Sequence, residues 1–152
     1  VYANGDSVFD GFTVTGGNAD HAKVLNGGGM YVLGATIRNC TFLRNSANLG
    51  GGGLFGYAKW LSDVLFESNS SRHLGGGAGL SVIAGSPFTR CVFRNNVAAA
   101  GGGGLYMSGH LDGGEIDECV FQGNSYTVGT SGGGGGAIYI DGYSSIRNSV
   151  FI

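Results

Sequence analysis

A nine-residue pattern recurs along this chain, and its period constrains the fold more than any other feature of the sequence. The pattern starts with an apolar residue, reaches Phe five residues later, and ends on Asn three residues after that Phe. It occupies residues 37–45, 61–69, 88–96 and 116–124, with a degenerate copy at 9–17 and a truncated copy at 146–151. The Phe-type positions lie 24 to 30 residues apart, at Val14, Phe42, Phe66, Phe93, Phe121 and Phe151. Self-similarity at such a period is the signature of a solenoid.

Glycine clusters between the copies exclude a helical solenoid. The chain contains 33 Gly among 152 residues, and each Gly in a helix interior costs roughly 1 kcal/mol relative to Ala. Each repeat is instead interpreted as one turn, or rung, of two or three short strands joined by tight corners. We therefore predict an all-β fold, a right-handed parallel β-helix (a single-stranded solenoid) of about six rungs that covers residues 1–152.

A second repeated strand precedes each Phe pattern, and strand alternation assigns its residues to two faces. Its first position should face the core together with the Phe, Cys and Ile/Leu columns of the repeat; these first residues are Val1, Met30, Leu54, Leu80, Leu105 and Ile138. Its middle position should face outward and form an aromatic column broken once by Ser; these residues are Tyr2, Tyr31, Phe55, Ser81, Tyr106 and Tyr139.

The repeated Asn is interpreted as a corner residue. Asn tolerates positive φ better than most residues, and stacked Asn side chains can form an amide ladder between rungs. We expect a structural ladder of Asn45, Asn69, Asn96 and Asn124.

Two outward columns are candidate contact surfaces. The aromatic column, with Tyr31, Phe55, Tyr106 and Tyr139, either stabilises the sheet by stacking or contacts a ligand. An apolar stripe of Leu65, Val92 and Val120, extended by Thr13, Thr41 and Val150, favours a partner, since it carries no charge.

Three cysteines, Cys40, Cys91 and Cys119, share one column two residues before the Phe. A column that elsewhere holds Phe12, Val64 and Ser149 is typical of a core position, so buried thiols are expected. A disulfide between Cys91 and Cys119 in adjacent rungs stays open as the alternative.

Catalytic, cofactor and metal sites are not predicted. The local acidic cluster is Asp112, Glu115, Asp117 and Glu118, and the other acids are scattered among bases along the bends. The three histidines, His21, His73 and His110, belong to corners of different rungs. The net charge of −2 gives no electrostatic case for nucleic acid. No apolar run approaches the ~20 residues of a transmembrane segment.

The four Phe-x-x-Asn motifs and the Gly-Gly-Ala-Ile sequence at residues 135–138 resemble the repeats of polymorphic outer-membrane proteins and of secreted bacterial parallel β-helix proteins. The resemblance implies an extracellular or bacterial cell-surface structural protein that acts in adhesion or assembly, with a glycan or a host surface as its partner. The alternative is a polysaccharide-binding or polysaccharide-degrading module of the pectate lyase-like type.

Both ends of the sequence fall within a rung. An open rung offers unpaired backbone groups above an apolar core. We therefore expect residues 1–152 to be an internal part of a longer solenoid, with further rungs in the parent chain, or else to stack end to end as a homo-oligomer.

Overall fold

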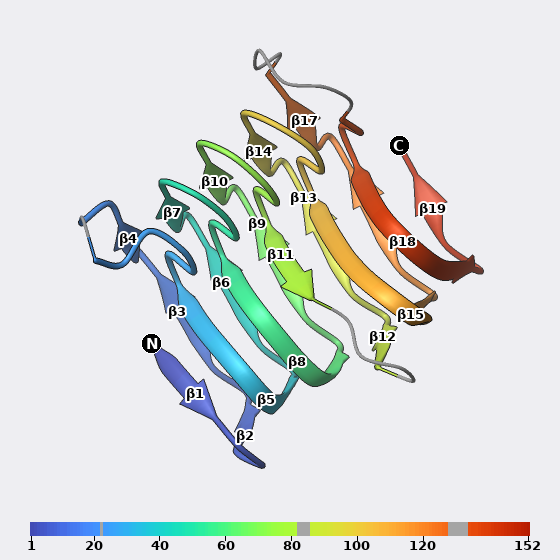
Figure 1. The fold of residues 1–152 in the computed structure, drawn as a ribbon, viewed down its shortest axis with the longest axis horizontal. Helices are drawn as coiled ribbons and strands as arrows, with labels where there is room; N and C mark the ends of the chain where they lie inside the picture. The colour runs from blue at the N-terminus through green and yellow to red at the C-terminus, as the bar shows by residue number, and fades with distance from the viewer. Residues whose placement is uncertain (22, 82–85, 128–133) are drawn as a thin grey trace.

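The computed structural model describes residues 1–152 except 22, 82–85 and 128–133, and it leaves out the side chains of residues 110–112. Strands stack along one axis from β1 at one end to β19 at the other, and the two termini lie at opposite ends of the stack (Figure 1). All pairings between named strands are parallel, as the parallel β-helix prediction required. Within the described residues, no helix is long and apolar enough to cross a bilayer.

Three sheets form the walls of the solenoid. The first comprises β1 (Tyr2–Asn4), β2 (Val8–Asp10), β5 (Met30–Arg38), β8 (Leu54–Ser62), β11 (Ala78–Ser81), β12 (Pro87–Thr89), β15 (Leu105–Asp117) and β18 (Ile138–Arg147). The second carries the repeated Phe and comprises β3 (Thr13–Thr15), β6 (Thr41–Leu43), β9 (Leu65–Glu67), β13 (Val92–Arg94), β16 (Val120–Gln122) and β19 (Val150–Phe151). The third comprises β4 (Asn18–Ala19), β7 (Ser46–Ala47), β10 (Ser70–Ser71), β14 (Val97–Ala98) and β17 (Ser125–Tyr126).

The chain visits the three sheets in the same order in every turn. The second sheet has six strands and the third has five, so the expected six rungs are about five turns followed by the start of a sixth. Long strands such as β5 and β8 bend around one corner of the coil (Figure 1). The repeat therefore sets the turn of the solenoid, and each repeated residue stacks on its equivalent in the next turn.

A column of stacked phenylalanines fills the core, as predicted. Phe42, Phe66, Phe93 and Phe121 are fully buried. Ring centroids are 5.1 Å apart between Phe42 and Phe66, and 4.8 Å apart in the next two pairs, with interplanar angles below 10°. The spacing follows from the ~4.8 Å distance between neighbouring strands, so burial and stacking reinforce the same register.

The predicted core assignment of Val1 is wrong. Val1 is 61% exposed, and Ala3 is the buried residue of β1. Ile138, in the last turn, is only half-buried. Val1 and Ile138 each stack against one neighbouring turn instead of two, so their burial is incomplete. Each still lies in the column that the sequence predicted.

The predicted alignment of the fourth turn is also wrong by two residues. Ala78, and not Leu80, pairs with Leu54 and Leu105, so Gly79 interrupts the aromatic column and Ser81 pairs with Ser108. Leu80 is still buried, because a shift of two residues keeps every side chain on its original face.

The corner conformation falls one residue earlier than expected. Positive φ belongs to Arg44, Ser68, Asn95 and Gly123, each of which directly precedes the repeated Asn. The Asn is therefore not the left-handed residue of the corner. Its side chain points inward and bonds to the neighbouring turn, which accounts for the Asn at this position.

Candidate contact surface and inter-turn ladders

The repeated Asn side chains point inward and form a continuous hydrogen-bonded ladder. The Asn69 Oδ1 atom accepts hydrogen bonds from the Asn45 backbone N–H at 3.0 Å and from Asn45 Nδ2 at 3.1 Å. Asn69 Nδ2 donates to the Phe42 carbonyl at 2.9 Å and to Asn96 Oδ1 at 3.0 Å. Asn96 repeats the pattern with Asn124. These amides are engaged within the wall, so the ladder belongs to the scaffold.

The glycine corners fit directly against the Asn ladder, a relationship that sequence reasoning missed. A Cβ atom at Gly53 would lie 3.2 Å from the Asn69 amide and 2.7 Å from the Gly77 carbonyl oxygen. A Cβ atom at Gly77 would meet Asn96 and the Gly104 carbonyl in the same way. The two sequence motifs are therefore complementary, because the glycine leaves the space that the inward amide of the same turn occupies. The glycine corners and the repeated Asn recur with the same period, and this shared period could have indicated their contact from the sequence.

The aromatic column lies on the outer face of the first sheet in two pieces. Ring centroids are 5.7 Å apart for Tyr31 and Phe55, and 5.7 Å apart for Tyr106 and Tyr139. All four residues are half-buried, and burial raises the pKa of Tyr106. Gly79 separates the two pieces. The rings of Tyr106 and Tyr139 are stacked, whereas those of Tyr31 and Phe55 are tilted by 42°. The contact role of this column stays a prediction.

The apolar stripe lies on the outer face of the second sheet. Leu65, Val92 and Val120 occupy equivalent positions of β9, β13 and β16 and pair in register. All three are half-buried. A salt bridge between Arg94 and Glu67 at 2.9 Å lies at the other outward position of the same strands. The stripe is therefore a narrow apolar band with a charged border, and its contact role also stays a prediction.

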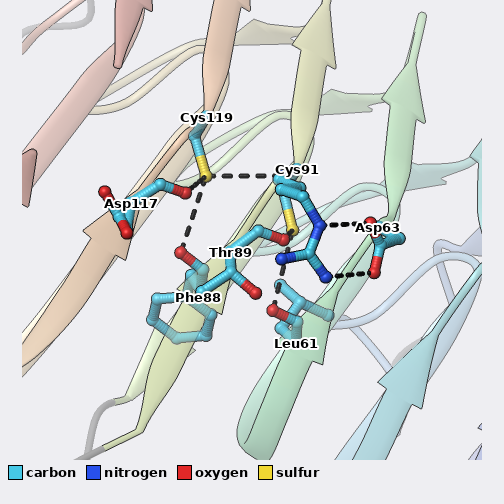
Figure 2. Close-up of polar contacts among 8 residues, drawn as sticks. Leu61, Asp63, Phe88, Thr89, Cys91, Asp117 and Cys119 are labelled. Atoms are coloured by element: carbon cyan, nitrogen blue, oxygen red, sulfur yellow. Dashed lines mark hydrogen bonds and ion pairs between the residues drawn. The ribbon is translucent and has the colours of Figure 1, made fainter. Parts of the chain in front are cut away.

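The bends between the first and second sheets carry ion pairs from turn to turn. Arg38 Nε contacts Asp10 Oδ2 at 3.0 Å. Arg90 binds both oxygens of Asp63 at 2.7 and 2.8 Å, and Figure 2 marks these two contacts at Asp63. The hydrogen bond from Arg90 lowers the pKa of Asp63. The hydrogen bond from Asn39 does the same for Asp10. Both carboxyl groups are held ionised, the opposite of what a general acid requires.

Trp60 borders these ion pairs and was not singled out from the sequence. It occupies an outward position of β8 opposite Thr36 of β5 and is 49% exposed. Its side chain lines a groove of about 640 Å³ that also includes Asp10, Arg38, Asp63 and Arg90. The sequence could have identified Trp60, since it is the one tryptophan of the chain and strand alternation from buried Leu61 places it on the outer face.

The three cysteine thiols are free and buried, and Cys91 and Cys119 form no disulfide. Cys91 Sγ contacts the Thr89 carbonyl at 3.4 Å, and Cys119 Sγ contacts the Asp117 carbonyl at 3.3 Å (Figure 2). Ser149, in the same column, donates to the carbonyl two residues earlier at 2.7 Å. Burial raises the pKa of Cys91. The cysteines and the serine of this column therefore each supply a small donor to the bend that precedes them.

The expected acidic cluster is divided among separate partners. Glu115 pairs with Arg147 at 3.2 Å, and Asp117 accepts a hydrogen bond from Asn148 at 2.8 Å. The side chains of Asp112 and His110 lie outside the described residues. Among the residues that are described, no three His, Cys, Asp or Glu side chains are grouped to hold a metal ion. His21 and His73 are exposed.

The fold and its inward ladders define a parallel β-helix repeat protein. Residues 90–108 match the model of the Chlamydia polymorphic membrane protein (Chlamydia_PMP) repeat. The matched segment contains Phe93, Asn96 and the glycine corner at 101–104, the elements that build the ladder. This similarity suggests the repeat region of a surface-associated outer-membrane protein. No curated protein and no solved structure matches the chain.

Proposed function

We propose that the chain is a non-enzymatic, adhesive segment of a bacterial cell-surface protein. The observation that carries this proposal is the stripe of Leu65, Val92 and Val120, which three successive turns hold in register on the outer face of one sheet. Outward apolar bands with polar borders are typical of protein contact surfaces. Similarity to the polymorphic membrane protein repeat supports a location at the cell surface.

The scaffold suits such a role because it satisfies its own polar groups. Among the described residues, no buried side-chain nitrogen or oxygen lacks a hydrogen-bond partner. The Asn ladder and the inter-turn ion pairs connect neighbouring turns. The outward columns are therefore displayed on a stiff wall, which lowers the entropy lost when a partner binds.

Adhesion is tested with beads that carry the chain and are incubated with cultured epithelial cells. The test variant combines Val92→Lys and Val120→Lys, which place two charges on the stripe. The matched control combines Ser70→Lys and Val97→Lys on exposed positions of the third sheet. We expect bead retention to fall at least several-fold for the stripe variant and to stay unchanged for the control. Failure of the unmodified chain to retain beads, or equal retention by both variants, would contradict the proposal.

A further inference from the structure

The groove beside Trp60 combines one aromatic face with a dense polar border. It is lined by residues of four successive turns, at the end of the first sheet and in the bend that follows it; these are Asp10, Thr36, Arg38, Asn39, Trp60, Ser62, Asp63 and Arg90. Its volume of about 640 Å³ lies within the ~300–1,000 Å³ range of small-ligand sites. From these features we propose that the groove binds a neutral oligosaccharide.

The aromatic component is the Trp60 indole. It is 49% exposed although its neighbour Leu61 is fully buried. Indole has a flat apolar face and an N–H that prefers a hydrogen-bond partner. The C–H face of a pyranose ring offers the matching flat apolar surface, surrounded by hydroxyl groups.

The charges of the groove cancel, which selects against ionic ligands. Two carboxylates, of Asp10 and Asp63, are joined to two guanidinium groups, of Arg38 and Arg90, by ion pairs whose side chains stay about half exposed. Each carboxylate has about four lone-pair sites and each guanidinium five N–H donors, more than the observed bonds use. Neighbouring hydroxyl groups of a sugar need both acceptors and donors, and this border supplies both.

The repeat of the groove fits a chain of sugars. Equivalent backbone positions recur once per turn, at ~4.8 Å along the solenoid axis, which is close to the advance of one hexose in an extended glycan. Different polar groups occupy these positions in successive turns, as Asp10, Arg38 and Ser62 do. Since the groove draws residues from four turns, several sugar units would lie along it, with one unit over Trp60. Binding without hydrolysis is expected, because glycoside hydrolysis needs a protonated carboxyl group as general acid, and hydrogen bonds from Arg90 and Asn39 lower the pKa of Asp63 and Asp10.

Trp60 provides a direct reporter, since it is the single tryptophan of the chain. The chain is titrated with cellohexaose, xylohexaose and fully N-acetylated chitohexaose, and with a heparin hexasaccharide as the anionic comparison, while tryptophan fluorescence is recorded. We expect a saturable change of intensity and wavelength with at least one neutral hexasaccharide and a Kd at least tenfold weaker for the anionic one. No change with any neutral hexasaccharide, or preference for the anionic one, would overturn the proposal.

Calorimetry of the same neutral hexasaccharide with variants locates the site. Trp60→Ala should weaken binding at least tenfold, while Trp60→Phe should retain most of it. Tyr143→Ala removes an exposed aromatic residue that is not part of the groove and should leave Kd unchanged. Equal affinity for Trp60→Ala and the unmodified chain would place the ligand elsewhere and overturn the proposal. This result is independent of bead adhesion, which probes the apolar stripe on another sheet.

Discussion

The side-chain nitrogen of Asn69 lies 3.0 Å from the side-chain oxygen of Asn96, one turn further along the chain. The same Asn96 oxygen accepts the Asn69 backbone N–H at 2.9 Å. Each link therefore joins two turns through both main chain and side chain. Since both residues are fully buried, water cannot replace a lost partner, and the ladder stabilises the solenoid only while it is complete.

Replacement of Asn69 by Ala should strongly destabilise the chain. The change leaves the Asn45 donors and the Phe42 carbonyl without their partner, and each buried unsatisfied group costs ~1–3 kcal/mol. We expect a loss of roughly 3 kcal/mol or more in the free energy of unfolding, measured by urea denaturation with circular dichroism. Asn48→Ala is the control, because Asn48 is half-exposed and bonds a carbonyl at 3.2 Å. Similar losses for both variants would show that the ladder has no special role.

Phe93→Ala should test the aromatic core. Phe93 is fully buried and lies 4.8 Å from the rings on both sides, and truncation of a buried aromatic residue costs ~3–5 kcal/mol. Hydrogen exchange should show increased opening first in β9, β13 and β16, since solenoid stability depends on neighbouring repeats. Phe12, although its column was expected to face the core, is 56% exposed, so Phe12→Ala should cost much less. An unchanged melting temperature for Phe93→Ala would refute the assigned core.

The Asp63–Arg90 pair should make stability depend on acid pH. Its hydrogen bond lowers the pKa of Asp63 in the folded chain below the ordinary value of 3.8. The pair therefore contributes its stabilisation above pH ~4 and loses it as pH falls through the lower, folded-state pKa. The effect is small, because both side chains are partly exposed.

This dependence is measured by comparing the melting temperatures of the unmodified chain and Asp63→Asn between pH 7 and pH 2. The unmodified chain should be the more stable one at neutral pH, and the difference should shrink below pH ~4. Ser68→Ala, at another bend residue with positive φ, should show no such convergence. A difference that stays constant or grows toward low pH would contradict the assignment.

Much of the fold follows from the sequence because every copy of the repeat independently predicts the same strands and corners. A period of 24 to 30 residues, with glycine corners, identifies a β-solenoid, and strand alternation separates inward Phe93 from outward Val92. Because the same pattern occurs several times, the burial of Phe42, Phe66, Phe93 and Phe121 was predicted correctly, whereas Phe151 in the last turn is 49% exposed. The register of the stripe was also predicted correctly. The same reasoning identified the buried Cys column from the residues that share it.

The remaining features depend on contacts between turns. In the fourth turn both Ala78 and Leu80 are compatible with the core, and only the hydrogen-bonded register with β8 and β15 selects Ala78. The amide ladder of the repeated Asn was predicted correctly, but the positive φ expected for Asn belongs to the preceding residue. The fit of the glycine corners against the Asn side chains appears only in the stacked coil. The Trp60 groove takes residues from four turns. Strand alternation alone assigns a residue to a face, but a groove requires side chains that are distant in the sequence to meet, and only the stacked coil brings them together.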